Sequence, residues 1–263
     1  MKINVHYCNQ HLDELYFTGK TSVVIDVLRA STVIVTALNN GAREVVPVGT
    51  VDFAMKVSGN AFGGQTILGG ERNTKKVEGF TLGNSPLEYT QETVASKSII
   101  LYTTNGSKAI VKAKFSENLF VCCFNNLFYV TNHLLNLNKD IEIICAGSNG
   151  NFNMEDAVCA GSLISEMSKV NDELELSDSA RASVVLNKSF GKNVARMLKQ
   201  TEHGKLLIEN GFAADIIECA KIGTTDIIPY YVAGAVKKLE TEDLQNKIVN
   251  EPKPSSNAEK KQA

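Results

Sequence analysis

Side chains able to bind anions or cations gather in four short segments of this chain. Each segment follows an apolar run and carries acidic, basic, hydroxyl or amide groups within a few residues of one another. Such groupings are typical of sites that hold a phosphate or a related anion, directly or through a metal ion. The four segments are residues 26–32, 69–86, 103–108 and 145–156.

The first segment combines an acid, a guanidinium and two hydroxyls. Asp26 and Arg29 are followed by Ser31 and Thr32, at the start of an apolar stretch with helical spacing. Arg29 can grip a phosphate or sulfonate with two N–H groups, and a helix start adds backbone donors. An equally good interpretation is a capped helix in which Asp26 merely pairs with Arg29.

The second and third segments have the composition of phosphate-binding loops. Glycines in the second segment allow the backbone to approach a ligand closely, and the third places polar groups at a strand-to-helix turn. An ordinary surface loop or an Asn-Gly turn has a similar composition, so each segment alone is weak evidence. The residues singled out here are Glu71, Arg72, Asn73, Asn84, Ser85, Asn105 and Lys108.

The fourth segment offers adjacent carboxylates, Glu155 and Asp156, beyond a strand. Together with Asp26 they suit Mg²⁺, which takes one or two carboxylates plus water and substrate phosphate. For either acid alone, compensation of a helix dipole is the slightly favoured alternative. His203 is a candidate acid or base, although a histidine at a helix boundary is more often structural.

Several common catalytic motifs are absent from the sequence. There is no G-x-x-x-x-G-K-[ST] loop, no G-x-G-x-x-G after a strand and no G-x-S-x-G elbow, which argues against P-loop, dinucleotide-binding and α/β-hydrolase classes. The four histidines form no H-E-x-x-H motif, and Asp26 lacks the second acid of paired-aspartate phosphatases.

Strand and helix patterns alternate along the chain. This alternation predicts a three-layer α/β/α fold with a parallel or mixed central sheet, in which ligands bind beyond the carboxyl ends of the strands. Predicted strands cover 22–27, 44–48, 98–103 and 141–146, and predicted helices follow Arg29, cover 51–58 and begin near residues 85, 107 and 153. Gly41 is expected to end the first helix, and Ser85 is expected to be an N-cap, with Glu88 completing a capping box.

Composition and charge exclude several classes of protein. The 263 residues are 43% hydrophobic and carry 27 basic against 29 acidic residues, for a formal net charge of −2. These values predict a globular fold and argue against nucleic-acid binding. No apolar run is long enough for a membrane span and no secretion signal is recognisable, so we expect a cytoplasmic protein without a membrane partner.

The six cysteines and the last residues complete the sequence-based expectations. Because no two cysteines form a C-x-x-C pair, we expect buried free thiols rather than a zinc site or a redox motif. Residues 1–240 are predicted to form the catalytic domain, with a division into two lobes left open. Residues 241–263 are predicted to be a disordered polar tail.

Taken together, the segments closely resemble the 2-phosphosulfolactate phosphatase family, from about residue 20 to residue 235 and in the family's order and spacing. The resemblance rests on the runs 24–32, 70–73, 79–80, 82–88, 103–108 and 145–147, with a later His-Gly turn at His203 and Gly204. It departs at Gly223, where the family is expected to carry an acid, and at Thr74, Asn125 and Asn126.

The resemblance implies a Mg²⁺-dependent phosphoric monoester hydrolase that converts 2-phospho-3-sulfolactate to 3-sulfolactate and phosphate, a step toward coenzyme M. Its expected partner is a small anionic metabolite, and self-association as a homo-oligomer stays open. The alternatives are a phosphatase for another small phosphorylated acid and a non-catalytic anion binder. The expected catalytic residues are Asp26, Glu71, Asp156 and His203; the substrate contacts are Arg29, Ser31, Thr32, Arg72, Asn73, Asn84, Ser85, Asn105 and Lys108; the metal ligands are Asp26, Glu155 and Asp156.

Overall fold

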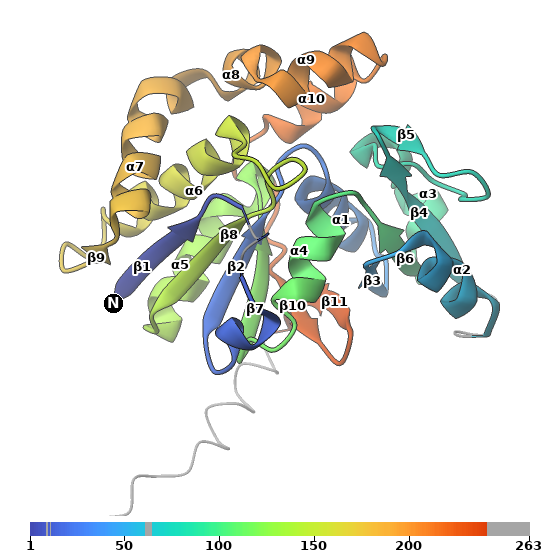
Figure 1. Ribbon diagram of the computed structural model, residues 1–263, viewed down its shortest axis with the longest axis horizontal. Coiled ribbons are helices and arrows are strands. Elements are labelled where there is room, and N and C mark those ends of the chain that lie inside the picture. Colours follow the sequence, from blue (N-terminus) through green and yellow to red (C-terminus); the bar gives the residue numbers. More distant parts are fainter. Residues whose placement is uncertain (9, 11, 61–64, 241–263) are drawn as a thin grey trace, which may run out of the picture.

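The computed structural model describes residues 1–8, 10, 12–60 and 65–240; the predicted tail, 241–263, lies outside the described residues. One eleven-stranded sheet runs through the molecule (Figure 1). Its strands, in chain order, are β1 (Lys2–His6), β2 (Thr21–Ile25), β3 (Glu44–Val48), β4 (Thr66–Arg72), β5 (Lys75–Lys76), β6 (Ser98–Tyr102), β7 (Asn118–Cys122), β8 (Ile141–Cys145), β9 (Glu175–Leu176), β10 (Pro229–Val232) and β11 (Ala235–Lys238).

The strand order is β5-β4-β6-β3-β11-β10-β7-β2-β8-β1-β9. Strands β4, β6 and β3 are parallel to one another, and β7, β2, β8, β1 and β9 form a second parallel group. The antiparallel hairpin β10–β11 lies between the two groups and pairs with β7 through Tyr230 and Phe120, and with β3 through Val236 and Val45. The sheet is therefore mixed, with two parallel halves.

Helices cover both faces of this sheet, because its strands are apolar on both sides. Within β2, Val23 and Ile25 pack into one core with α5 (Leu127–Leu137) and α6 (Met154–Met167), whereas Val24 packs into another with α1 (Ala30–Asn39) and α4 (Gly106–Lys112). The predicted three-layer α/β/α fold with a mixed sheet is confirmed. The α-helices are α1 (Ala30–Asn39), α2 (Val51–Asn60), α3 (Gln91–Val94), α4 (Gly106–Lys112), α5 (Leu127–Leu137), α6 (Met154–Met167), α7 (Asp178–Phe190), α8 (Val194–Gln200), α9 (Glu202–Glu209) and α10 (Ala213–Cys219), and the short 3-10 turns are η1 (Glu14–Phe17), η2 (Pro86–Glu88), η3 (Phe124–Asn126) and η4 (Gly191–Asn193).

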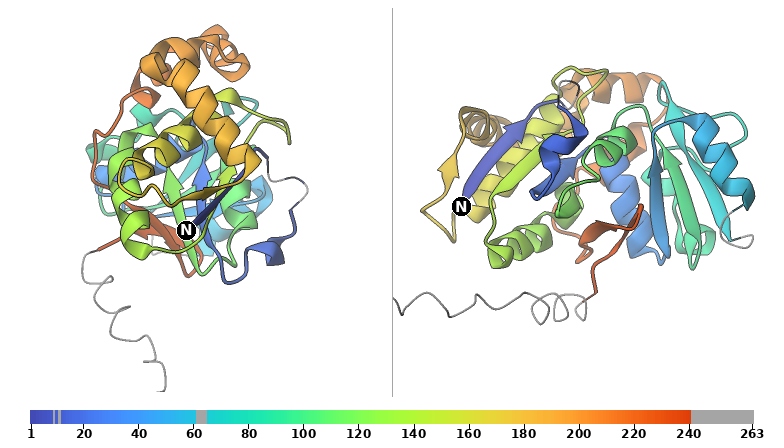
Figure 2. Two further views of the ribbon diagram at one scale, coloured as in Figure 1. Left: turned by 90° about the vertical axis from the view of Figure 1, so that its left-hand side faces the viewer. Right: turned by 60° about the horizontal axis from the view of Figure 1, so that its bottom comes forward.

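Three short helices, α8, α9 and α10, lie across the end of the sheet at which the parallel strands finish; we call them the helical cap. They run along the top of the molecule in Figure 1 and appear in orange above the strands in Figure 2. The loops that carry the predicted site residues emerge at the same end, so the cap faces them. None of the described helices is long and apolar enough to span a membrane.

The structure differs from the sequence-based expectation after Asn84. A capped helix was predicted there, but the chain forms only the 3-10 turn η2 and the short helix α3. The predicted N-cap, Ser85, makes no capping bond, because its hydroxyl donates to Asp215 at 2.6 Å. Glu88 likewise accepts from the Gly83 N–H rather than closing a capping box.

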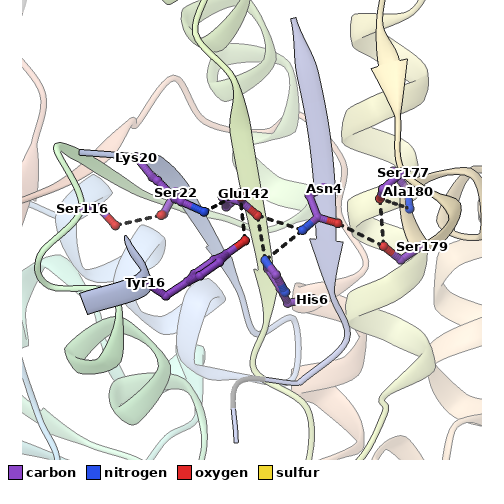
Figure 3. A network of polar contacts seen from close by, with 10 residues as sticks. All are labelled: Asn4, His6, Tyr16, Lys20, Ser22, Ser116, Glu142, Ser177, Ser179 and Ala180. Atoms are coloured by element: carbon purple, nitrogen blue, oxygen red, sulfur yellow. Dashed lines mark hydrogen bonds and ion pairs between the residues drawn. The ribbon is translucent and has the colours of Figure 1, made fainter. Parts of the chain in front are cut away.

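Away from the cap, one carboxylate connects the first strands of the sheet (Figure 3). Glu142, on β8, accepts hydrogen bonds from Asn4 at 3.0 Å and Lys20 at 3.1 Å, and its Oε2 lies 2.7 Å from His6 Nε2. The Tyr16 hydroxyl also donates to Glu142, at 3.1 Å. Burial alone would raise the pKa of Glu142, but the bonds from His6, Lys20 and Asn4 outweigh it and lower this pKa to about 2.

We expect Glu142→Gln to lower the free energy of unfolding at pH 7 by about 1–2 kcal/mol. The loss is no larger because water screens the partly exposed Glu142 carboxylate. Since the folded pKa is below that of an ordinary glutamate, this stability is present above pH 4.5 and lost as pH falls toward 2. Urea unfolding at several pH values measures it. Glu117→Gln, which alters an exposed ion pair with Lys139, is the control. Equal effects of the two variants would contradict the assignment.

Candidate functional site

Asp26 follows the last residue of β2 and lies at the edge of the sheet beneath the cap. Its carboxylate accepts from the Ala30 N–H at 3.3 Å and is only 7% exposed. The Ser31 hydroxyl accepts from the Asp26 N–H at 2.9 Å, and the Thr32 hydroxyl donates to the Val27 carbonyl at 3.0 Å. Both hydroxyls, predicted as substrate contacts, thus bind the backbone of the turn that presents Asp26.

Arg29 is buried rather than open to solvent. Its Nη1 donates to Asp215 at 2.6 Å, its Nη2 donates to the Thr74 carbonyl at 3.0 Å, and its guanidinium carbon lies 4.3 Å from the Phe212 ring centre. Among the described residues its ion pair is therefore with the cap. The alternative of a simple Asp26–Arg29 pair does not describe this turn.

Glu71 holds two loops together. One carboxylate oxygen accepts from the Thr74 N–H and the other from the Thr104 N–H, both at 2.8 Å. Thr74 has a positive φ of 69°, so the turn after β4 is sharp and depends on this bond. The Glu71 carboxylate, expected to be catalytic, is placed to position the loops after β4 and β6.

The two adjacent acids at the start of α6 have different surroundings. Asp156 accepts from the Val27 N–H at 2.9 Å and the Gly147 N–H at 3.2 Å, which joins the turns after β2 and β8. Glu155 is 1% exposed, and its Oε1 has no hydrogen-bond partner in the described part of the chain. Of the two, Glu155 has the carboxylate oxygen that is available to a ligand.

Buried polar atoms without a hydrogen-bond partner among the described residues mark where a ligand can bind. Glu155 Oε1 lies 3.7 Å from His203 Nδ1, which comes from α9 of the cap. The other side chains of this kind come from the loops after β4 and β6 and before η2. The atoms are Thr74 Oγ1, Asn84 Oδ1, Thr104 Oγ1, Glu155 Oε1 and His203 Nδ1.

The acids of the site are close enough to raise one another's pKa. Burial raises the pKa of Asp26 to about 7, and the charges of Glu71 and Glu155 add to this effect. Burial raises the pKa of Glu155 to about 7 and, with the Asp26 charge, that of Asp156 well above its usual range. Burial and the Arg29 charge lower the pKa of His203 to about 4, so its imidazole is neutral at pH 7.

The remaining predicted contacts lie around this centre. Asn105 accepts from the Asn149 N–H at 3.1 Å, which joins the loops after β6 and β8. Arg72, Asn73 and Lys108 are exposed and lie outside the buried cluster. The structure thus brings together the acids, Arg29 and His203, and leaves these three side chains at its margin.

The carboxylates of the site have the type of donor atom that Mg²⁺ prefers. Within the described residues, no three His, Cys, Asp or Glu side chains converge to form a metal cage. Mg²⁺ does not require one, because it keeps waters and takes substrate phosphate as a ligand. Asp26 and the unpartnered Glu155 oxygen fit this role, whereas both oxygens of Asp156 already accept backbone N–H groups.

Asp215 is a site residue that sequence reasoning missed. It is 2% exposed and touches both Arg29 and Ser85. In the sequence it stands in the first turn of a short helix, where an acid is typically read as favouring the helix dipole. Apolar neighbours on both sides, Ala213–Ala214 and Ile216–Ile217, were the only local signal that this acid is buried.

Gly106, the first residue of α4, leaves room for Asp26. A Cβ at this position would lie 2.4 Å from Asp26 Oδ2 and 2.5 Å from the Ala30 Cβ. We expect Gly106→Ala to displace the Asp26 turn and reduce phosphatase kcat/KM about 10²-fold, as displacements of about 1 Å do in active sites. Gly49→Ala is the control, because no atom of the described residues beyond its chain neighbours lies within 4 Å of its added Cβ. A Gly106→Ala enzyme as active as the control would refute this interpretation.

The sequence departures have structural explanations. Gly223 has a φ of 63°, and a Cβ there would meet the Phe128 ring at 2.3 Å, so glycine fits this position. Asn125 and Asn126 donate to the carbonyls of Glu218 and Ile227, which ties the turn after β7 to the segment that leads to β10. As expected, the cysteines are free, and all but Cys8 are buried.

Comparison with known proteins identifies the family. Residues 7–234 match the family described as 2-phosphosulpholactate phosphatase. A protein of Clostridium beijerinckii named "Probable 2-phosphosulfolactate phosphatase" is 37% identical over 236 residues, 90% of this chain and 99% of the relative. Proteins of the same name from Caldanaerobacter subterraneus and Clostridium novyi are each 40% identical, over 83% and 88% of this chain and 90% and 97% of their own lengths.

A family match over nearly the whole chain agrees with the fold and with the buried acids beneath the cap. The chain belongs to the 2-phosphosulpholactate phosphatase family and is an enzyme of the phosphoric monoester hydrolase type.

Proposed function

We propose that this chain hydrolyses 2-phospho-3-sulfolactate to 3-sulfolactate and inorganic phosphate, with Mg²⁺ as its cofactor. The observation that carries the proposal is the burial of two acids in the site: Asp26 is 7% exposed and Glu155 is 1% exposed, and Glu155 Oε1 has no hydrogen-bond partner among the described residues. Acids facing an anionic substrate repel it unless a cation intervenes. A site of this kind therefore needs a metal to accept a phosphate ester.

The chain's own residues supply the framework for this reaction. Asp26 and Glu155 would hold the ion, while Glu71 and Asp156 fix the loops that present them. A bound Mg²⁺ would neutralise the phosphoryl oxygens and the charge that develops on them. Asp26 has a second candidate role, as the nucleophile that attacks phosphorus. Arg29 adds a positive charge close to Asp26 and His203.

The choice of substrate depends on which residues bind its sulfonate and carboxylate. Arg72, at the end of β4, and Lys108, in the first turns of α4, are exposed, and they are our candidates for contacts with the sulfonate and the carboxylate. The relatives' names support 2-phospho-3-sulfolactate over other phosphorylated acids. We propose a cytoplasmic enzyme that serves a step toward coenzyme M; the buried free thiols agree with a reducing compartment.

Phosphate release from purified protein tests the proposal. We expect turnover of 2-phospho-3-sulfolactate with Mg²⁺, and a kcat/KM at least about tenfold lower for phospholactate and phosphoglycolate, which lack the sulfonate. Faster turnover of phospholactate would reassign the substrate. Tight binding of 3-sulfolactate in calorimetry, without phosphate release from any of the three esters, would indicate an anion binder instead.

A further inference from the structure

The helical cap places one buried acid at the edge of the site, and the reaction described above does not use it. The side chain of Asp215, in α10, is 3% exposed. Its Oδ2 accepts from Arg29 Nη1 and its Oδ1 accepts from the Ser85 hydroxyl, both at 2.6 Å. A single carboxylate thus joins two predicted substrate contacts that come from separate loops of the sheet.

The cap makes a second contact with Arg29, through an aromatic ring. Phe212, the residue before α10, lies with its ring centre 4.3 Å from the guanidinium carbon. Another nitrogen of the guanidinium, Nη2, donates to the Thr74 carbonyl at 3.0 Å. The Arg29 side chain is 1% exposed, so these contacts fix its position rather than tether a mobile surface group.

The guanidinium has more N–H groups than its contacts with Asp215 and Thr74 use. Arginine has five N–H groups, and the hydrogen bonds to Asp215 and Thr74 occupy two of them among the described residues. The Arg29 charge also acts on Asp26 and on His203, which places it close to both the acid of the first turn and the imidazole of the cap. A displaced Arg29 would therefore alter the centre of the site.

We propose that Asp215 is a positioning residue for the hydrolysis: it fixes the Arg29 guanidinium for the substrate, holds the loop of Ser85 by accepting from its hydroxyl, and makes this arrangement depend on the cap. The inference rests on the proposed function and adds the residue that completes its anion-binding side. Buried ion pairs are costly to form, and one use of them is to fix a single geometry. Here Asp215 joins the cap to Arg29 in the loop after β2 and to Ser85 in the loop before η2.

Asp215→Asn is the first test, because it keeps the size of the side chain and removes its charge. We expect kcat/KM for 2-phospho-3-sulfolactate to fall about 10²-fold, the typical cost of a misplaced positioning group. Glu209→Gln, an acid at the end of α9 in the same cap, is the matched control and should stay within about twofold of the unchanged enzyme. Circular dichroism and thermal unfolding establish that each variant is folded at the assay temperature.

Chemical rescue separates positioning from a merely structural role. In Arg29→Ala, added guanidinium can occupy the vacated position if the Asp215 carboxylate is there to bind it. We expect millimolar guanidinium to restore activity at least about tenfold in Arg29→Ala and not in the Arg29→Ala, Asp215→Asn double variant. Equal rescue in the two proteins, or an Asp215→Asn enzyme as active as the control, overturns the inference.

Two further measurements test the role of Asp215 if the first variant does not fold or if the enzyme releases no phosphate. If Asp215→Asn does not fold, Ser85→Ala decides it: this variant keeps the ion pair, and we expect a loss of about fivefold in kcat/KM, whereas an unchanged value overturns the inference. If the unchanged enzyme releases no phosphate, the proposed function fails, and titration with inorganic phosphate then decides the inference. Positioning predicts binding at least about tenfold weaker in Asp215→Asn, whereas loss of a repulsive charge alone predicts tighter binding.

Discussion

Asp26→Asn should reduce kcat by at least about 10³-fold, equivalent to about 4 kcal/mol of lost transition-state stabilisation, while the protein becomes more stable. Activity falls because an amide at this position has neither the charge to hold a cation nor a nucleophilic oxygen. Stability rises because the folded state raises the pKa of Asp26 to about 7. The ionised form is thus disfavoured by folding above pH 4, and a neutral amide removes that cost.

The size of the stability gain distinguishes this interpretation from simple damage. We expect about 1–3 kcal/mol at pH 7 without metal, measured by urea unfolding, and no gain at pH 4, where Asp26 is protonated in the folded state. The amide can still accept from the Ala30 N–H, so the turn is retained. Asp178→Asn, an acid in the first turn of α7, is the control. An active Asp26→Asn enzyme, or one that is both inactive and less stable, would remove Asp26 from the centre of the site.

Withdrawal of Mg²⁺ should have the second largest effect. We expect a chelator to lower kcat at least about 10²-fold, with full recovery when Mg²⁺ is returned. Glu155→Gln should raise the Mg²⁺ concentration for half-maximal activity by about 10- to 100-fold, the range typical for weakened metal coordination. The buried Glu155 Oε1, unpartnered among the described residues, is the reason for choosing this acid over Asp156. Steady-state assays across a Mg²⁺ series measure both effects.

The Mg²⁺ concentration needed for activity should also depend on pH, in a direction that the pKa values of the acids predict. Since Asp26 and Glu155 both have pKa values of about 7, protons compete with the ion below neutral pH. The half-saturating Mg²⁺ concentration should therefore rise as pH falls from 8 to 6. Glu202→Gln changes a charge that acts on Glu155 without providing a ligand, and serves as the control. Activity that persists in chelator, or equal shifts in both variants, would refute the metal assignment.

Much of the fold was predictable because local patterns and burial agree. The run Thr21–Ile25 is buried along its whole length and forms the central strand β2, as its β-branched residues predict. Gly41, with a φ of 85°, ends the first helix as expected. Ser85 is the instructive failure, because its local signal for a helix start lost to a buried partner 130 residues away. A contact at that distance leaves no trace in the local pattern.

The sequence predicted which loops come together at one edge of the sheet, but not the contacts that each of their acids makes. Polar residues after β2, β6 and β8 and at the end of β4 were predicted to lie close together, and hydrogen bonds join these segments in the structure. Which acid is free and which is held depends on backbone N–H groups from other loops, such as Val27 and Gly147 at Asp156. The contribution of the cap was not predictable, because Asp215 meets Arg29 only after the chain has crossed the sheet.

The hairpin β10–β11 sets the order in which the sheet can be completed during synthesis. Each parallel half pairs within itself. Helix α1 packs against strands of both halves, but among the described strands the halves are hydrogen-bonded to each other only through β10 and β11, which follow all the others in the chain. Until residues 229–238 are made, β3 and β7 are open edges with unpaired backbone groups, a state that invites association between chains. The cap residues, 194–219, are made just before the hairpin. The residues of the cap are therefore synthesised before the strands that hydrogen-bond β3 to β7, and pairing of the hairpin completes the sheet.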